Sequence, residues 1–170
     1  MRITYSLALT GVAATPAAAA GIDLTVEIPR LSVAEYHKPY VAAWIEQGGV
    51  AKQTVAVWYD SDMEGGKGKK WLADLRTWWR KAGRTMTMPA DGVTGATRAP
   101  GPQKLSLLAG KAPLGTLAPG QYDLVIEAAR EVGGRESLRL PFTWPAKGKA
   151  QTVTAKGTAE LGAVTATIKP

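Results

Sequence analysis

The first regular pattern after residue 20 is an alternation of apolar and polar side chains. The segment 22–28 has an apolar residue at every second position, namely Ile22, Leu24, Val26 and Ile28. A period of two is typical of a strand with one buried face. Segments 40–47 and 54–60 are β-prone and apolar on both faces, which predicts central strands covered on each side. The link "GGVAK" between them predicts a hairpin.

Between residues 65 and 83 the period changes to that of a helix. Six apolar residues fall on one helical face: Trp71, Leu72, Leu75, Trp78, Trp79 and Ala82. Gly83 comes after Arg80, Lys81 and Ala82, and basic residues shortly before a glycine are a helix stop signal. The pattern predicts one amphipathic helix of about 13 residues, packed by its tryptophans on a sheet, after a flexible "GGKGKK" approach. A second interpretation has one tryptophan also stacking on a planar ligand.

The C-terminal half returns to strand patterns after a loop-rich stretch, residues 84–104, that three prolines interrupt. Alternating residues around Gly133-Gly134 predict a β-hairpin, and segment 164–168 alternates again. The stretch "LAPGQY", which ends at Tyr122, resembles the corner before a late strand of immunoglobulin-like sandwiches, where a tyrosine hydroxyl bonds back to the chain. The fold expected is mainly β: an antiparallel immunoglobulin- or fibronectin-like β-sandwich with one inserted amphipathic helix.

The first 20 residues have the features of a secretory signal peptide. Arg2 precedes a short apolar run, and Ala18 to Ala20 form a small-residue cleavage signal. We therefore expect a signal peptide over 1–20, a single β-sandwich domain over 21–170, and a periplasmic protein. No later segment approaches the roughly 20 apolar residues of a membrane helix, so the mature protein is expected to be soluble.

Charge and composition narrow the choice of partner and chemistry. The formal charge of +7 falls to about +6 when Arg2 leaves with the leader. In an exported protein this positive charge favours an acidic partner, or peripheral contact with an anionic membrane, over nucleic acid. The alternative is that the charge is spread over the surface and serves solubility. The absence of cysteine excludes disulfides, iron-sulfur clusters and Cys-linked haem. The only histidine, His37, is expected to be structural, and no metal site or catalytic residue is predicted.

Residues 91–97, "DGVTGAT", match the pattern Asp-x-x-Ser/Thr-Gly-Ala-Ser/Thr. This pattern resembles the acceptor motif for covalent flavinylation by ApbE-type transferases, which move FMN from FAD onto the last hydroxyl. The resemblance implies FMN attached to Thr97 by a phosphoester. A covalent tether would also retain a cofactor that an exported protein loses by diffusion. The expected cofactor-binding residues are Asp91, Thr94, Gly95, Ala96, Thr97 and Arg98.

Each neighbour of Thr97 has an expected role. Gly95 would permit positive φ and close approach of another backbone, and Ala96 adds little bulk beside the attacking oxygen. Asp91 would cap the turn through its carboxylate or help dock the segment in the transferase. Arg98 would pair with the phosphodiester. The alternative for the whole segment is an ordinary unmodified turn.

Several segments between Glu27 and Pro145 are also similar to a family of predicted periplasmic proteins of unknown function, often found alongside PepSY-type membrane reductases. They include "KPYVAAWIEQ", "KKWLADLRTWWRKAG" and "LAPGQYDLVIEAAREVGGRESLRLPFTWP". The resemblance implies an exported electron-transfer flavoprotein that exchanges electrons with a membrane reductase. Such a chain would be a carrier and a substrate of the transferase rather than an enzyme. The alternatives are a cofactor-free immunoglobulin-like binding or assembly module and a haem- or metal-uptake accessory protein.

Overall fold

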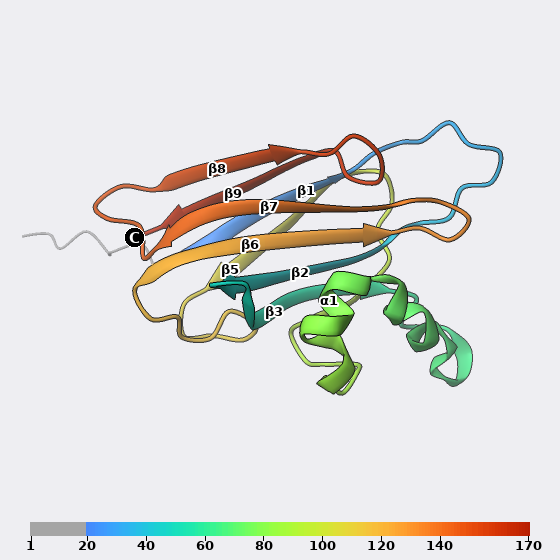
Figure 1. Cartoon of the computed structure of the whole chain (residues 1–170), viewed down its shortest axis with the longest axis horizontal. Helices are drawn as coiled ribbons and strands as arrows, with labels where there is room; N and C mark the ends of the chain where they lie inside the picture. The colour runs from blue at the N-terminus through green and yellow to red at the C-terminus, as the bar shows by residue number, and fades with distance from the viewer. Residues whose placement is uncertain (1–19) are drawn as a thin grey trace, which may run out of the picture.

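Two β-sheets packed face to face form the body of the structure, a computed structural model that describes residues 20–170 (Figure 1). The four-stranded sheet has the order β5-β1-β9-β8, with strands β5 (Gly101–Leu108), β1 (Gly21–Ile28), β9 (Ala163–Lys169) and β8 (Gln151–Lys156). The five-stranded sheet has the order β4-β3-β2-β6-β7, with strands β4 (Thr94–Ala96), β3 (Val50–Tyr59), β2 (Tyr40–Gln47), β6 (Gly120–Ala129) and β7 (Arg135–Trp144). The mainly β architecture is confirmed.

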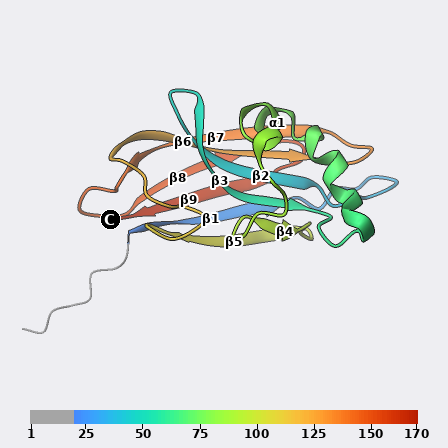
Figure 2. The ribbon, with the colours of Figure 1, turned by 90° about the horizontal axis from the view of Figure 1, so that it is seen from below.

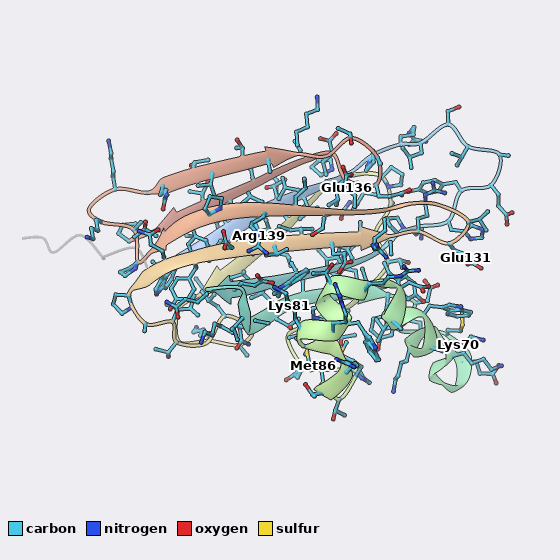
Figure 3. The ribbon with its side chains drawn as sticks, in the orientation of Figure 1. Lys70, Lys81, Met86, Glu131, Glu136 and Arg139 are labelled. Atoms are coloured by element: carbon cyan, nitrogen blue, oxygen red, sulfur yellow. The ribbon has the colours of Figure 1, made fainter. Side chains whose placement is uncertain are left out.

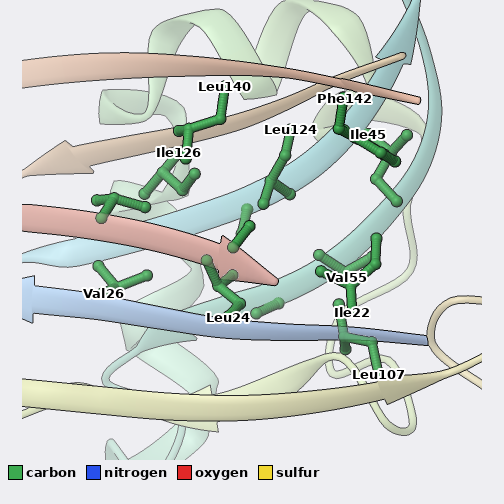
Figure 4. Packing of buried hydrophobic residues seen from close by; sticks show 14 of the residues in the cluster. Ile22, Leu24, Val26, Ile45, Val55, Leu107, Leu124, Ile126, Leu140 and Phe142 are labelled. Carbon is green, nitrogen blue, oxygen red and sulfur yellow. The ribbon is translucent and has the colours of Figure 1, made fainter. Parts of the chain in front are cut away.

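The core between the sheets is built from the apolar side chains that point inward from strands of both sheets (Figure 4). Ile22 and Val26 of β1 are 0% exposed, as are Leu124 and Ile126 of β6 on the opposite sheet. The half-buried strand predicted over 22–28 is therefore confirmed. Burying each such side chain stabilises the fold by about 1.5 to 3 kcal/mol, so this core is the main source of stability in a chain without disulfides.

A helical layer covers the outer face of the five-stranded sheet, on the side away from β1 and β5 (Figure 2). It consists of the 3-10 helix η1 (Glu64–Asp74), the α-helix α1 (Arg76–Lys81) and the 3-10 turn η2 (Gly83–Thr85). The prediction of one continuous helix is wrong, because Leu75 leaves helical backbone geometry at φ −75° and ψ 68°. The glycines at 65, 66 and 68 weaken helix formation in the preceding turns. The predicted packing of Trp78 on the sheet is confirmed, since it is 0% exposed.

A buried carboxylate on strand β6 holds the start of α1. Glu127 is 0% exposed and faces the helical layer. Its carboxylate oxygens accept hydrogen bonds from the backbone N–H of Thr77 at 3.0 and 3.1 Å and of Trp78 at 2.8 Å. The first N–H groups of a helix have no partner within the helix, so Glu127 supplies from the sheet the cap that the short helix lacks.

A second buried carboxylate, Glu46 of β2, holds the other end of α1. It accepts hydrogen bonds from Lys81 Nζ at 2.7 Å, Trp44 Nε1 at 2.6 Å and Arg139 Nη2 at 2.9 Å. Figure 3 labels Lys81 on α1 and Arg139 on β7. Burial alone would raise the pKa of Glu46, but hydrogen bonds from Lys81, Trp44 and Arg139 outweigh it and hold that pKa below its usual value. The six-residue helix is thus fixed to the sheet at both ends.

Both predicted hairpins are confirmed. Strands β2 and β3 are joined through Gly48 and Gly49, which have φ of 58° and 79° and so need the freedom of glycine. Strands β6 and β7 pair over their whole length on either side of residues 130–134. The hydroxyl of Tyr122 donates to the carbonyl of Ala118 at 2.7 Å, which confirms the expected corner contact. The narrower immunoglobulin- or fibronectin-like identity stays a prediction.

Two expectations about the strands are wrong. The predicted loop-rich stretch, residues 84–104, contains β4 and the start of β5, and β5 pairs with β1 along its whole length. Strand β5 is an edge strand with mostly exposed or half-buried residues, so it lacks a strong apolar signal, and an edge tolerates Pro102. The sheet is also not purely antiparallel, because β4 runs parallel to β3.

The predicted signal peptide lies almost entirely outside the described residues, which begin at Ala20. Within residues 20–170, no helix is long and apolar enough to cross a membrane.

Glu136 of β7 ties the loop after β8 to the sheet (Figure 3). Its carboxylate accepts hydrogen bonds from the backbone N–H of Thr158 at 2.7 Å, Ala159 at 3.1 Å and Leu161 at 2.9 Å. Partial burial alone would raise the pKa of Glu136, but these N–H groups outweigh it and hold the pKa below its usual value. A lowered pKa in the folded state means that the stabilisation is fully present above the unfolded pKa and is lost as the pH falls through the folded pKa.

We therefore expect Glu136→Gln to lower the free energy of unfolding by about 1 to 2 kcal/mol at neutral pH. The difference from the wild type should begin to shrink as the pH falls below about 4.5, because the carboxylate is protonated first in the unfolded chain and only at a lower pH in the folded protein. Urea unfolding across this pH range measures the difference. The exposed Glu64 provides the control variant Glu64→Gln, and a wild-type advantage that stays constant as the pH falls would contradict the assignment.

Candidate functional site

The "DGVTGAT" segment forms an edge strand rather than a free turn. Thr94, Gly95 and Ala96 pair in parallel with Val57, Trp58 and Tyr59 at the end of β3. The backbone N–H of Thr97 continues this alignment by donating to the carbonyl of Tyr59 at 3.2 Å. Parallel pairing places the ends of β3 and β4 at the same edge of the sheet, so the chain just after β3 lies beside the chain just after β4.

Gly95 serves a different purpose from the expected one. Its φ is not positive; the positive-φ glycine of this segment is Gly92, at 69°. A Cβ atom on Gly95 would lie 3.1 Å from Cδ1 of Trp58 and 3.3 Å from Nη2 of Arg98. The strand lies tightly against an indole ring here, so a larger residue would force Trp58 or Arg98 to shift slightly.

Thr97 is half-buried, and its hydroxyl is held by a carboxylate. The Oγ1 of Thr97 donates to Oδ1 of Asp60 at 3.1 Å. Asp60 is the first residue after β3, and its backbone is packed against Gly68 so closely that a Cβ atom at Gly68 would collide with the Asp60 carbonyl. The prediction that the glycines of "GGKGKK" form a flexible approach to the helix is therefore wrong for Gly68, which is buried and fixes the position of Asp60.

Thr97 and Asp60 lie in the wall of a cavity of about 280 Å³, close to the lower end of the range for ligand sites. Figure 1 shows the loop before β2, the β6–β7 turn and the helical layer together at this end of the sandwich. The aromatic residues of the wall are Tyr36, Tyr40 and Trp71. Its basic residues are His37, Lys38 and Arg130, and its acidic residues besides Asp60 are Asp74 and Glu131. The wall of the cavity therefore combines aromatic rings with side chains of both charges.

Two residues of this wall each carry a polar atom that has no hydrogen-bond partner within residues 20–170. The two atoms are the hydroxyl of Tyr36 and Nη1 of Arg130, and both are buried. The side chain of Arg130 is only 6% exposed, and its Nε and Nη2 donate to Glu160 at 2.9 and 3.1 Å. The hydroxyl of Tyr59, outside this wall, is a third such group among the described residues. Buried polar groups are almost always hydrogen-bonded, so these three are exceptions to that rule.

The tyrosines of the wall are neutral donors at physiological pH. Burial raises the pKa of Tyr40 to about 12, and the nearby carboxylate of Asp60 adds to the rise. Burial also raises the pKa of Tyr36. Neutral phenols can donate hydrogen bonds and present apolar ring faces without adding charge, so the charge of the cavity comes from its basic and acidic side chains.

A second, shallower cavity also has Thr97 in its wall. Its lining includes Lys38, Asp60 and Thr97 again, together with Asp62 and Ala96. Lys38 is exposed and is the only basic residue common to both cavities. Within the described chain, no three His, Cys, Asp or Glu side chains are grouped as metal ligands. Thr97 therefore lies beside Lys38 and Asp60 in the walls of both cavities.

The family comparison covers nearly all of this structure. A family model described as "Predicted periplasmic protein (DUF2271)" matches residues 21–163. The chain belongs to the DUF2271 family. Neither the curated proteins nor the solved structures gave a match.

The other predicted site residues of this DUF2271 member lie on either side of Thr97. Asp91 is exposed, and its Oδ1 accepts from the backbone N–H of Gly92 at 3.1 Å. Thr94 accepts from the backbone N–H of Ala90 at 2.8 Å and closes the turn that leads into β4. Arg98 is exposed and places its guanidinium carbon 5.2 Å from the ring centroid of Trp58. Among the described residues, Arg98 therefore contacts Trp58 rather than lining the cavities beside Thr97.

Sequence reasoning did not find the partners of Thr97 in this family member. Asp60, Lys38 and Arg130 belong to no motif that points to a flavin. The aromatic and basic composition of "YHKPY" is a signal, and it lies directly at the start of β2. Nothing in the sequence, however, indicated the parallel pairing that brings residues 36–40, 60 and 97 together.

Proposed function

We propose that this chain is an exported electron-transfer flavoprotein that carries FMN covalently on Thr97 and relays electrons with a PepSY-type membrane reductase. The observation that supports the proposal most is the place of the motif's acceptor hydroxyl, in the wall of an aromatic-lined cavity. FMN, when bound, supplies reversible electron transfer, and the protein positions it and sets its surroundings. The chain itself is a substrate of an ApbE-type transferase and then a carrier.

The residues present fit this cofactor. A phosphoester on Thr97 carries negative charge, and Lys38, which borders both cavities, offers the opposite charge. Trp71, Tyr36 and Tyr40 offer apolar ring faces for a planar heterocycle. The interpretation of a helix tryptophan as a stacking residue is thus supported for Trp71.

The surface beside the cavity supports an acidic partner. Lys67, Lys69 and Lys70 are exposed on η1, next to Trp71 of the cavity wall. Figure 3 labels Lys70, whose Nζ lies 4.4 Å from the ring centroid of Trp71. A cluster of one sign raises the rate at which oppositely charged surfaces meet. A membrane reductase with acidic residues around its electron-exit site, or anionic lipid around that reductase, would be guided to the cavity.

The proposal is tested by exporting the protein from cells that also express an ApbE-type transferase. The purified protein is unfolded in denaturant and desalted, and its visible absorbance is recorded. A flavin spectrum that stays with the unfolded chain is the expected result. A colourless chain, in cells where a known acceptor becomes yellow, would favour the second candidate, a cofactor-free binding module, and a Soret band would favour a haem carrier.

A further inference from the structure

We infer that Asp60 is the proton acceptor for Thr97 when FMN is attached, so that the acceptor protein brings its own base to the reaction. This inference rests on the proposed function. It concerns a residue that lies 37 positions before the acceptor in the chain and outside the flavinylation motif.

The geometry around Thr97 is that of a hydroxyl already oriented by a carboxylate. The Thr97 Oγ1 to Asp60 Oδ1 distance is 3.1 Å, within the range at which a general base takes a proton. Two constraints hold this pair in place. The backbone N–H of Thr97 is bonded to the carbonyl of Tyr59, and the carbonyl of Asp60 is enclosed by Gly68 and by the backbone N–H of Met63 at 3.3 Å.

The reaction balances with Asp60 as the base. The Oγ1 of Thr97 attacks the phosphorus that belongs to the FMN half of FAD. A new bond forms between Oγ1 and that phosphorus, the bond to the AMP oxygen breaks, and AMP leaves with the bonding electron pair. The proton of Oγ1 passes to the carboxylate of Asp60. Nothing is oxidised or reduced, and an aspartate has the same task toward substrate hydroxyls in protein kinases.

Two other candidate bases near Thr97, His37 and Asp62, contact other groups. His37 lies 3.0 Å from Glu35 and 3.6 Å from Glu131, measured from its two ring nitrogens. Asp62 accepts from the hydroxyl of Ser61 at 3.2 Å. Asp62 also lines the shallower cavity that Asp60 and Thr97 share, so it is a matched control for the loss of one carboxylate at this place.

The test compares rates of modification. Wild type, Asp60→Asn, Asp60→Glu and Asp62→Asn are exported from cells without a transferase, purified, and checked for folding by thermal unfolding. Each is then incubated with a purified ApbE-type transferase, FAD and Mg²⁺, and intact mass is followed with time. Asparagine keeps the size of aspartate and an acceptor oxygen but cannot take the proton. Asp60→Asn is expected to be modified at least about a hundredfold more slowly than the wild type, the usual lower value for losing a general base.

The two other variants are expected to behave differently. Asp62→Asn should be modified within about twofold of the wild-type rate. Asp60→Glu keeps a carboxylate and should be modified within about tenfold of that rate. Both losses are small compared with the loss expected when a general base is removed. Modification of folded Asp60→Asn at the wild-type rate would overturn the assignment. So would an Asp60→Glu variant as slow as Asp60→Asn, because the shape of aspartate rather than its basicity would then matter. An unmodified wild type beside a modified known acceptor would instead overturn the proposed function.

Discussion

Thr97→Ala is expected to abolish covalent flavin attachment completely. The variant lacks the only atom to which the phosphorus can be joined at this position, and the hydroxyl of Thr94 is already bonded to the backbone of Ala90 at the far end of β4. A threonine hydroxyl attacks only when a base and an activated phosphorus are held beside it, so no other threonine should substitute for Thr97. Coexpression with an ApbE-type transferase, followed by in-gel flavin fluorescence of the denatured protein, measures the loss.

Two further variants make the result specific. Thr97→Ser keeps the hydroxyl and the bond to Asp60, so its fluorescence should remain close to that of the wild type. Thr85→Ala removes an exposed threonine outside the motif, whose hydroxyl contacts only the carbonyl of Ala82 at 3.1 Å among the described residues, and it should have no effect. Fluorescence that persists in Thr97→Ala would show that the flavin is attached to another residue.

Among the stability variants proposed for this protein, Glu127→Ala is expected to cause the largest decrease in the free energy of unfolding. The substitution leaves the backbone N–H groups of Thr77 and Trp78 without a partner and removes a charge that lies 3.6 Å from Arg135. Leaving such groups unsatisfied costs about 1 to 3 kcal/mol, and more for charged groups, so a loss of about 2 to 4 kcal/mol is expected. For a chain of this length that corresponds to a decrease of roughly 5 to 15 °C in the midpoint of thermal unfolding.

Chemical denaturation followed by tryptophan fluorescence measures this loss. Glu127→Gln keeps one acceptor oxygen and should cost about half as much. Glu64→Ala removes an exposed glutamate of the helical layer and should change the free energy of unfolding by less than about 0.5 kcal/mol. If Glu127→Ala were as stable as Glu64→Ala, the buried carboxylate would not be the anchor of α1.

The elements with a strong apolar period could be predicted from the sequence, because their period reflects burial in the folded state. Strand β1 alternates in sequence and in burial alike, and the β2–β3 hairpin is marked by glycines with positive φ. The edge strand β5 has almost no fully buried residue, so it carries little apolar period to detect. The predicted helix is too long because Leu75 fits the helical period while its buried side chain lies where the backbone departs from the helix.

The site could be predicted only in part. The motif identified Thr97 because it is a local pattern of nearby residues. Its partner Asp60 depends on the three-residue parallel pairing of β3 with β4, and such a short strand has no period. The orientation of Arg98 depends on the same pairing, since it places the side chain over Trp58. Local sequence thus indicated the acceptor, while its environment required the tertiary structure.

Intact-mass spectrometry of the wild-type protein is the decisive test of covalent flavinylation. The protein is exported from cells that express an ApbE-type transferase and is measured in denaturing solvent beside the same protein from cells without it. We expect a mass gain equal to FMN less one water, carried by the tryptic peptide that contains Thr97 and present only with the transferase. An unchanged mass, under conditions in which a known acceptor gains the flavin, would contradict the assignment of this chain as a flavin carrier.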